Sequence, residues 1–258
     1  MAAPSIRDKA AIVGIGQTMF SKHLGLSEYE MAVEAIWNAC DDAGISPREI
    51  DGIVRYDIEQ IDEEQLLAVL GNPLLRYFAG TSWGGGGSAS VLVVAAAAIA
   101  SGLARIVLVY RAGAMAAGAH HIRLSNLFAR PWEEESAVRV ARQVFTMAEC
   151  APSDIDAAFF YDFFTSLVII ALEQYGFAPR GEGGPFVENG GLAWPHGRLV
   201  CNTNGGQLCE AFVHGFNNSV EAVRQIRGTS TAQLEHCELV LVAGGNTDPT
   251  GAVILRRD

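Results

Sequence analysis

The sequence predicts an α/β fold made of two similar halves, each with strands and helices in a layered arrangement. One observation is the regular alternation of short apolar runs with amphipathic stretches along the chain, which is typical of sheets covered by helices. The other is a repeat: Pro152–Asp156 follows the pattern of Pro47–Asp51. In each copy a helix ends, a turn with proline follows, and Ile-Asp leads into an apolar run. One duplicated βα unit predicts a pseudo-twofold α/β/α structure.

The first elements of the first half are expected in the order strand, helix, strand. Ala10–Ile15 is a short apolar run ending near glycine and predicts a buried strand. Ser27–Ala43 predicts a helix, because Ser27 and Glu30 have the spacing of a capping box and Gly44 is suited to end it. Ile50–Tyr56 predicts the second strand.

A glycine-rich loop is the most distinctive feature of the first half. After a short helix at Leu66–Leu70, four glycines at Gly84–Gly87 lead into a small, apolar helix that ends near Gly102. A helix that is apolar on all sides is expected to be buried. Its first turn offers backbone N–H groups at the positive end of the helix dipole. Ile106–Tyr110 then predicts a fully buried strand.

The second half repeats this order. Val138–Cys150 predicts an amphipathic helix, Gly205–Gly206 is expected to open a long helix ending near Gly228, and Leu239–Ala243 predicts a buried strand. We therefore divide the chain into a first half (1–112), a connecting region (113–135) and a second half (136–258).

Composition excludes several classes of protein. The chain has 258 residues, a net charge of −11 and 50% hydrophobic residues, with only 18% charged. A disordered chain has the opposite composition. Without a basic field, neither nucleic acid nor an anionic membrane surface is expected as a partner. The longest apolar run, Val91–Ala100, is too short to span a bilayer. With no signal peptide at the N-terminus, we expect a cytoplasmic protein that hides apolar surface in an oligomer.

The sequence also argues against metal and nucleotide sites. The five cysteines are scattered without a CxxC pair, so neither a disulfide framework nor a structural zinc site is expected. His120 and His121 are adjacent and do not form a one-face metal pair. Gly14-Ile15-Gly16 lacks the third glycine of a dinucleotide fingerprint.

Several motifs in both halves resemble one family. They are AAIVGIGQTMFSK, AGISPREIDGIV, ASGLARIVLVYRA, PSDIDAAFFYDFF, YGFAPRGEGGPFV and NTNGGQLCEAFVHGFNNSVEAVRQIRGTS. They are similar to sterol-carrier-protein-X-type thiolases, especially the lipid-transfer-protein branch of steroid side-chain aldolases. The resemblance implies a layered α/β/α/β/α thiolase-like fold. Members of this family are longer, so the loop domain is expected to be absent, or not represented, between the two halves.

The resemblance also exposes what the chain lacks. A thiolase has a cysteine where this chain has Gly85–Gly87, and a second one before the Gly-Gly that is Gly244–Gly245 here. Phe212 stands at the position of the family's histidine. Because Claisen chemistry needs a thiolate and a base, we do not expect a thiolase mechanism; residual thiolase activity stays only as an alternative.

The candidate catalytic residues that the chain does have fit an aldolase. Tyr161 occupies the position that carries a tyrosine in the aldolase branch and is our main candidate for acid/base work, although it also belongs to a cluster of aromatic residues that could be core. Cys209 and His214 are the further catalytic candidates. If the helix runs on from Gly206, Cys209 shares a face with Phe212, whereas His214 is turned away from it. A buried, inert Cys209, a structural His214 and a helix-capping Asp162 are the plainer alternatives.

Backbone groups complete the predicted site. Gly85, Gly86, Gly205 and Gly206 could donate N–H groups to a thioester oxyanion, although tight turns explain them equally well. Substrate binding is also assigned to Asn204, Phe212 and Gly244.

The function expected from the resemblance is retro-aldol cleavage of a β-hydroxyacyl-CoA with a steroid-like or other bulky side chain. The alternatives are a non-catalytic, acyl-CoA-binding or scaffold subunit of a larger complex, and an acyl-CoA acyltransferase. The resemblance implies a homodimer and a small zinc-ribbon and OB-fold partner protein. We expect no cofactor, since CoA is part of the substrate, and no metal.

Overall fold

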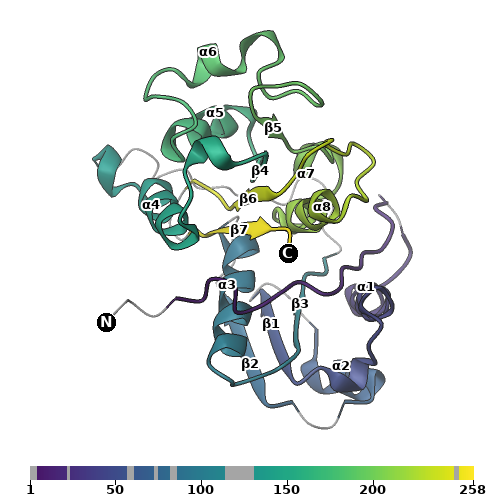
Figure 1. Cartoon of the computed structure of the whole chain (residues 1–258). Helices are drawn as coiled ribbons and strands as arrows, with labels where there is room; N and C mark the ends of the chain where they lie inside the picture. Colours follow the sequence, from purple (N-terminus) through teal and green to yellow (C-terminus); the bar gives the residue numbers. More distant parts are fainter. Residues whose placement is uncertain are drawn as a thin grey trace. The chain divides into compact units, whose positions relative to one another are not determined.

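The computed structural model describes residues 5–21, 24–56, 61–72, 75–81, 86–113, 131–246 and 250–258. The chain forms two compact units, which are described separately (Figure 1). Unit 1 holds residues 1–83 and 91–120, and unit 2 holds 84–90 and 121–258. Gly85, His120, His121 and most of the connecting region predicted at 113–135 lie outside the described residues.

Unit 1 contains a parallel three-stranded sheet in the order β2-β1-β3. Helices α1 and α2 pack against this sheet through a core that includes Ile36, Ile53 and Leu66. The helix after the glycine loop, α3, begins in unit 2 and continues in unit 1. The elements are α1 (Glu28–Ala43), η1 (Pro47–Glu49), β1 (Gly52–Tyr56), α2 (Glu63–Leu70), β2 (Tyr77–Thr81), α3 (Gly87–Ala100) and β3 (Val107–Tyr110).

The predicted boundaries of α1 are confirmed. The Ser27 hydroxyl accepts the Glu30 N–H at 3.2 Å, and the Glu30 carboxylate accepts the Ser27 N–H at 2.8 Å. Gly44 ends the helix in the left-handed conformation. These two bonds satisfy backbone donors that the first turn leaves without a helical partner.

The strand predicted at Ala10–Ile15 is wrong, because this segment has no strand structure. Its backbone is held by α1 side chains instead. The Ile15 N–H donates to Asp42 at 2.8 Å, and the Asn38 amide donates to the Gln17 carbonyl at 3.2 Å. The predicted burial is wrong as well, because no residue of the segment is buried and Val13 is 57% exposed.

Unit 2 contains a four-stranded sheet in the order β5-β4-β6-β7, in which only β7 is antiparallel to its neighbour. Its elements, apart from the start of α3, are η2 (Trp132–Glu134), α4 (Ser136–Ala148), η3 (Pro152–Asp154), β4 (Ala157–Phe160), α5 (Thr165–Gln174), α6 (Gly183–Val187), η4 (Glu188–Gly190), β5 (Val200–Cys201), α7 (Gly206–Cys209), α8 (Phe216–Arg227), β6 (Leu239–Ala243) and β7 (Ala252–Arg256).

The two faces of the unit 2 sheet are covered by different helices. Ala158 and Phe160 of β4 point into a core with α4 and α5. Ala157 and Phe159 point to the opposite face and pack with Ala222 of α8. This alternation follows from the two-residue period of a strand. All four residues are almost fully buried. This explains why the sequence of β4 is apolar throughout and does not alternate between apolar and polar residues.

The predicted duplication is confirmed by matching strand order and by matching capping bonds. The order β2-β1-β3 corresponds to β5-β4-β6. In each copy the carboxylate of the aspartate in the Ile-Asp pair accepts hydrogen bonds from two consecutive backbone N–H groups just before or at the start of the neighbouring strand. Both bonds of Asp51 are 2.8 Å long, and those of Asp156 are 2.7 and 2.9 Å long. The donors are Arg105 and Ile106 in unit 1, and Glu238 and Leu239 in unit 2.

The long helix predicted from Gly206 to about Gly228 is wrong. The chain makes the single turn α7, leaves the helical conformation at Glu210, and starts again as α8 at Phe216. The intervening His214 and Gly215 both have positive φ angles, of 55° and 79°. A left-handed pair of residues cannot continue a right-handed helix, so the helical-face comparison of Cys209 with His214 does not apply.

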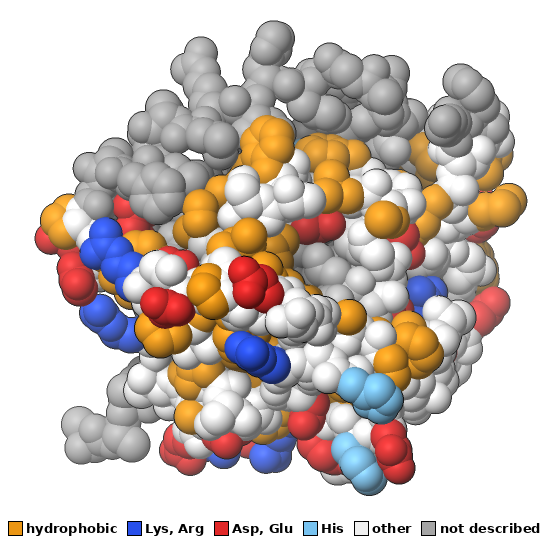
Figure 2. All heavy atoms as spheres, turned by 90° about the horizontal axis from the view of Figure 1, so that it is seen from above, with side chains coloured by type: hydrophobic (Ala, Val, Ile, Leu, Met, Phe, Trp, Pro, Cys, Tyr) orange, Lys and Arg blue, Asp and Glu red, His pale blue; other side chains and the backbone are white. Residues whose placement is uncertain are grey.

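The described surface carries no single-sign patch on the face that Figure 2 shows, where basic side chains are scattered among acidic and apolar ones. Within the described ranges, no helix is long and apolar enough to cross a membrane. Nor do three or more metal-ligating side chains cluster among those residues. All five cysteines are free thiols.

The capping role of Asp156 can be tested by stability. Asp156→Ala removes the acceptor of two backbone N–H groups, and leaving them unpaired should lower the free energy of unfolding by about 1–3 kcal/mol. Urea denaturation measures this loss. Glu235→Ala, at an exposed position in the preceding loop, is the control and should change the free energy of unfolding little. Equal effects of the two substitutions would contradict the capping role.

Candidate active site

Tyr161 lies at the carboxyl end of β4, where parallel strands of α/β proteins commonly present ligand-binding groups. Its backbone N–H donates to the Ala243 carbonyl of β6 at 3.1 Å. The side chain is 5% exposed, and its ring centroid lies 4.8 Å from that of Phe163. Both the backbone and the ring of Tyr161 are therefore held by neighbouring elements.

Gly215 packs directly beneath the ring of Tyr161. A Cβ atom on Gly215 would lie 2.7 Å from Tyr161 Cδ2 and 3.4 Å from Ser88 Oγ. Its φ of 79° is also one that glycine adopts at no steric cost. The start of α8, the first turn of α3 and Tyr161 thus meet at one point within unit 2.

Asp162 caps the short helix α7, which confirms the plainer interpretation of this residue. Its carboxylate accepts the N–H of Gln207 at 3.0 Å and, more weakly, that of Leu208 at 3.5 Å. Any side chain at Gly206 would clash with this carboxylate. Burial raises the pKa of Asp162 above its ordinary value, and hydrogen bonds from the backbone N–H groups of Gln207, Asp162 itself and Leu208 offset part of that rise.

The predicted substrate-binding residue Asn204 uses its side chain within the loop. Its amide oxygen accepts the Gly206 N–H at 3.1 Å, and its amide nitrogen donates to the Glu210 carboxylate at 2.6 Å. Gly205 and Gly206 both have positive φ and form the tight turn before α7. The structure supports the tight-turn interpretation for this glycine pair.

The other catalytic candidates occupy different environments from those expected. Cys209 is exposed, not buried. His214 is 5% exposed, and its ring packs edge-on against Phe212 at 4.9 Å between centroids. His214 directly precedes Gly215, so its backbone lies next to Tyr161.

Gly86 and Gly244 both lie next to Gly251. The Gly244 N–H donates to the Gly251 carbonyl at 2.9 Å. A Cβ atom on Gly251 would come within 3.4 Å of the Gly86 carbonyl. The turn that starts α3 and the carboxyl end of β6 therefore border the same region of unit 2 as Tyr161.

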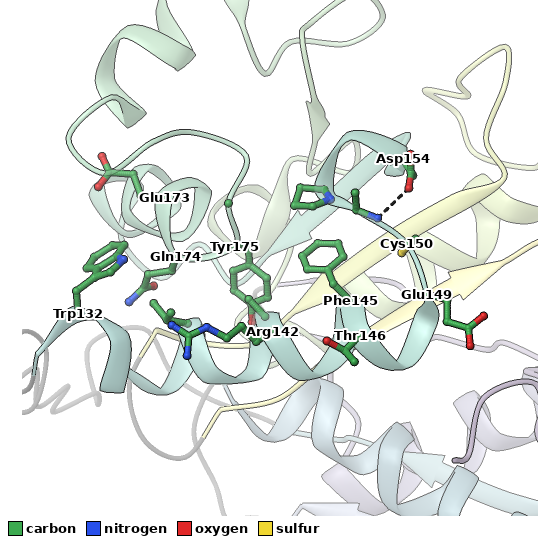
Figure 3. Close-up of a pocket in the computed structure, with 15 residues that line it drawn as sticks. Trp132, Arg142, Phe145, Thr146, Glu149, Cys150, Asp154, Glu173, Gln174 and Tyr175 are labelled. Carbon is green, nitrogen blue, oxygen red and sulfur yellow. Dashed lines mark hydrogen bonds between the residues drawn. The ribbon is translucent and has the colours of Figure 1, made fainter. Parts of the chain in front are cut away.

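A pocket of about 740 Å³ lies on the α4 and α5 side of the sheet. Figure 3 shows Gln174 and Tyr175 pointing from the end of α5 towards α4, with Trp132 at one end of the pocket and Asp154 at the other. Tyr161 is not among its lining residues. Among the described residues, the hydroxyl of Tyr175 and the Nε2 atom of Gln174 have no hydrogen-bond partner.

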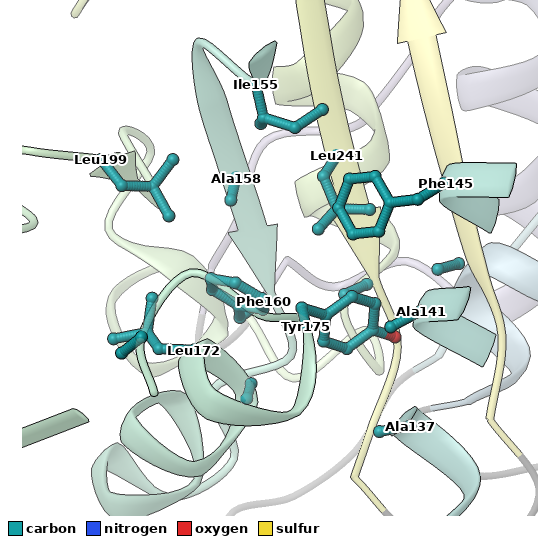
Figure 4. Packing of buried hydrophobic residues seen from close by; sticks show 14 residues of the cluster. Ala137, Ala141, Phe145, Ile155, Ala158, Phe160, Leu172, Tyr175, Leu199 and Leu241 are labelled. Atoms are coloured by element: carbon teal, nitrogen blue, oxygen red, sulfur yellow. The ribbon is translucent and has the colours of Figure 1, made fainter. Parts of the chain in front are cut away.

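The core on this side supports the peptide that leads into Tyr161. The ring of Phe160 packs edge-on against that of Tyr175, with 5.9 Å between the ring centroids (Figure 4). It packs in the same way against Phe177 at 6.0 Å. Burial raises the pKa of the Tyr175 phenol. Tyr175 is thus a core tyrosine, unlike Tyr161, which borders the loops.

Sequence reasoning missed four residues that shape the site: Gly215, Ser88, Asn202 and Asn218. Asn202 stands directly after β5, and Asn218 stands three residues after Gly215. Asparagine and glycine tolerate left-handed backbone and mark turns. The paired signals in NTNGG and HGFNN therefore pointed to a broken helix rather than a continuous one.

The contact beneath Tyr161 can be tested with two glycines of α8. Gly215→Ala and Gly228→Ala each place a Cβ on a left-handed residue, which costs roughly 1–2 kcal/mol. Only Gly215→Ala adds a clash with Tyr161, because a Cβ atom on Gly228 would meet none of the described residues within 4 Å. The free energy of unfolding should therefore fall more for Gly215→Ala in chemical denaturation. Equal losses would show that Gly215 does not support the ring.

The raised pKa of Asp162 predicts a pH dependence of stability. A raised pKa means that the native state binds the proton more tightly than the unfolded state, so the free energy of unfolding falls as pH rises. The fall starts near the ordinary carboxyl pKa of about 3.9 and ends at the raised value. Urea denaturation at several pH values should show this contribution in the wild type and its loss in Asp162→Asn. Parallel profiles for the two proteins would contradict the pKa shift.

Comparison with known proteins places this geometry in a family. The chain is 27% identical to the steroid side-chain-cleaving aldolase of Thermomonospora curvata, covering 96% of this chain and 98% of that protein. It is also 27% identical to the 17-hydroxy-3-oxo-4-pregnene-20-carboxyl-CoA lyase of Mycobacterium tuberculosis, covering 96% and 99%. These alignments run over 384 and 382 positions, against 258 residues in this chain. The expected shortening relative to the family is therefore confirmed.

Solved structures support the same relationship. The Ltp2-ChsH2(DUF35) aldolase matches with a TM-score of 0.87 at 27% identity, covering 96% of this chain and 97% of that chain. The SCP2-thiolase-like protein type 1 of Mycobacterium smegmatis matches with a TM-score of 0.57 at 14% identity, covering 90% and 73%, and shares the fold. The family described as thiolase C-terminal domain-like matches residues 117–257, more than half of the sequence. The resemblance inferred from the motifs is confirmed, and the chain belongs to the thiolase C-terminal domain-like family.

Proposed function

We propose that this protein is a carbon–carbon lyase that cleaves a β-hydroxyacyl-CoA by a retro-aldol reaction. The observation that carries the proposal is the position of Tyr161, buried at the carboxyl end of β4 and fixed by Ala243, Phe163 and Gly215. The relatives at 27% identity are named as an aldolase and a CoA lyase, which supports the same reaction.

The reaction needs a group that moves protons. A base removes the proton of the β-hydroxyl, the bond between Cα and Cβ breaks to give a ketone, and the enolate left on the thioester takes a proton at Cα. A phenol can donate that proton without help from its surroundings, since its ordinary pKa is about 10. We assign this donor role to Tyr161.

The rim of the site suits a substrate with a bulky apolar acyl chain. The rings of Tyr161, Phe163 and Phe164 follow one another at 4.8 and 5.3 Å, from the buried Tyr161 to Phe164, which is 42% exposed. Leu208, next to the Asp162 carboxylate, is 55% exposed. Exposed apolar groups beside a buried polar one favour an amphipathic substrate whose ring system stays on the rim. We propose a steroid-like acyl chain, as in the substrate name of the mycobacterial relative.

The proposal includes assembly. A zinc-ribbon and OB-fold partner protein and a homodimer remain our expectations from the resemblance. The structural match to the Ltp2-ChsH2(DUF35) aldolase supports a partner subunit for this chain.

A specific observation keeps a second candidate in view. Phe212 offers no hydroxyl, and its ring packs on His214. A non-catalytic, acyl-CoA-binding subunit would share the fold and lack the turnover. The proton-transfer role of Tyr161 is what separates the two functions.

The test compares two tyrosine variants. Purified protein, alone and co-expressed with a DUF35-type partner, is incubated with 17-hydroxy-3-oxo-4-pregnene-20-carboxyl-CoA, and ketone release is measured. Tyr161→Phe should lower kcat about 10²- to 10⁴-fold, as loss of a general acid does. Tyr175→Phe is the matched control, because its buried hydroxyl has no hydrogen-bond partner in the part of the chain that the structure describes, and it should keep wild-type turnover.

Three outcomes decide between the candidates. Ketone release that depends on Tyr161 supports the lyase. Release that is unchanged in Tyr161→Phe refutes the role of this residue. Saturable acyl-CoA binding without release of ketone, with the partner present, favours the non-catalytic subunit.

A further inference from the structure

The sheet hydrogen bonds next to Phe160, the residue before Tyr161, are made by side chains rather than by a strand. β5 has only two residues, and its pairing with β4 ends at Ala158 and Cys201. The chain then turns at Asn202, which has a φ of 45°. Phe160 therefore has no backbone partner on this side of the sheet among the described residues.

Asn202 takes the place of the missing strand. Its Oδ1 accepts the Phe160 N–H at 2.9 Å, and its Nδ2 donates to the Phe160 carbonyl at 3.0 Å. One side-chain amide thus reproduces both bonds that a neighbouring strand would make. The pairing also fixes the orientation of the amide, since only this orientation presents a donor to the carbonyl and an acceptor to the N–H.

Asn218, in the first turn of α8, adds a second donor. Its Nδ2 donates to the same Phe160 carbonyl at 2.9 Å, and its side chain is 1% exposed. A carbonyl oxygen has two lone pairs, so these two amides satisfy it fully. The Phe160 peptide is held by groups that are 42 and 58 residues away in the sequence.

The same network reaches the segment under the ring of Tyr161. Glu210 accepts the amide of Asn204 at 2.6 Å and that of Asn217 at 2.7 Å. These bonds join both ends of the break between α7 and α8, the segment that contains Gly215. Asn204 also donates to Asn218 Oδ1 at 3.4 Å. The backbone before Tyr161 and the segment beneath its ring are therefore positioned by connected side-chain amides.

We infer that Asn202 and Asn218 are positioning residues for the phenol of Tyr161. Fixing the Phe160 peptide on one side, while Ala243 accepts the Tyr161 N–H on the other, leaves the Tyr161 backbone little freedom to move. This inference rests on the proposed function for its effect on turnover. A misplacement of about 1 Å can cost about 100-fold in rate.

The test uses Asn218→Ala and Asn218→Asp, the second of which keeps the shape but loses the donor. Both should lower kcat about 10- to 100-fold with little change in KM. Asn72→Ala is the matched control in unit 1, where the buried Asn72 amide likewise donates to a backbone carbonyl at the start of a strand. It should lower the melting temperature by a similar amount and leave kcat unchanged.

A spectroscopic arm separates failure of this inference from failure of the proposed function. With 3-fluorotyrosine incorporated, the ¹⁹F resonance of residue 161 is assigned by its absence in Tyr161→Phe. That resonance should shift or broaden in both Asn218 variants and stay unchanged in Asn72→Ala. If the wild type shows no turnover, the proposed function fails, and the resonance alone decides the positioning role. An unchanged resonance, or equal kcat losses in Asn218→Ala and Asn72→Ala, would overturn the inference.

Discussion

The hydrogen bonds at the carboxyl end of β4 hold the parts of the site in a fixed relation. Phe160 is bonded to Asn202 and Asn218, Tyr161 to Ala243, and Asp162 to the first turn of α7. Each of three consecutive residues thus ties β4 to a different part of unit 2. Because these groups are buried, leaving any of them unpaired is costly. The short helix α7, which carries Cys209, and the segment that carries Gly215 are therefore restricted in conformation.

This arrangement shows how a thiolase-like unit can support a different reaction. By the resemblance, the places where a thiolase has its cysteines hold Gly85–Gly87 and Ala243 in this sequence. The carboxyl end of β4 instead presents a tyrosine, Tyr161. The duplicated unit supplies the scaffold, with Asp51 and Asp156 making the same strand-leading bonds in the two copies. Shortening relative to the aldolase relatives leaves this repeated scaffold intact.

Most of the scaffold could be predicted from the sequence, because its signals are local. Ser27 and Glu30 defined the start of α1, and the Ile-Asp repeat identified the duplication. The two errors have different causes, a distant bonding partner in one case and local left-handed residues in the other. Ala10–Ile15 bonds to α1 side chains instead of a strand, and the helix from Gly206 is broken by left-handed residues at His214 and Gly215.

The site was predictable in part. Tyr161 was found through its motif, and the structure places it among buried groups. The hydrogen bonds from Asn202 and Asn218 to the Phe160 backbone could not be predicted, since they depend on β5 ending after two residues and on α8 starting at Phe216. Asn204, expected to touch substrate, instead bonds to Gly206 and Glu210.

The most direct test of the central claim is mass spectrometry of the acyl-CoA released when a β-hydroxyacyl-CoA is turned over in deuterated water. The retro-aldol account predicts a ketone and a shorter acyl-CoA with one deuterium at Cα, formed without added free CoA. An acyl-CoA that forms only when free CoA is supplied would contradict it, because that requirement belongs to thiolytic cleavage.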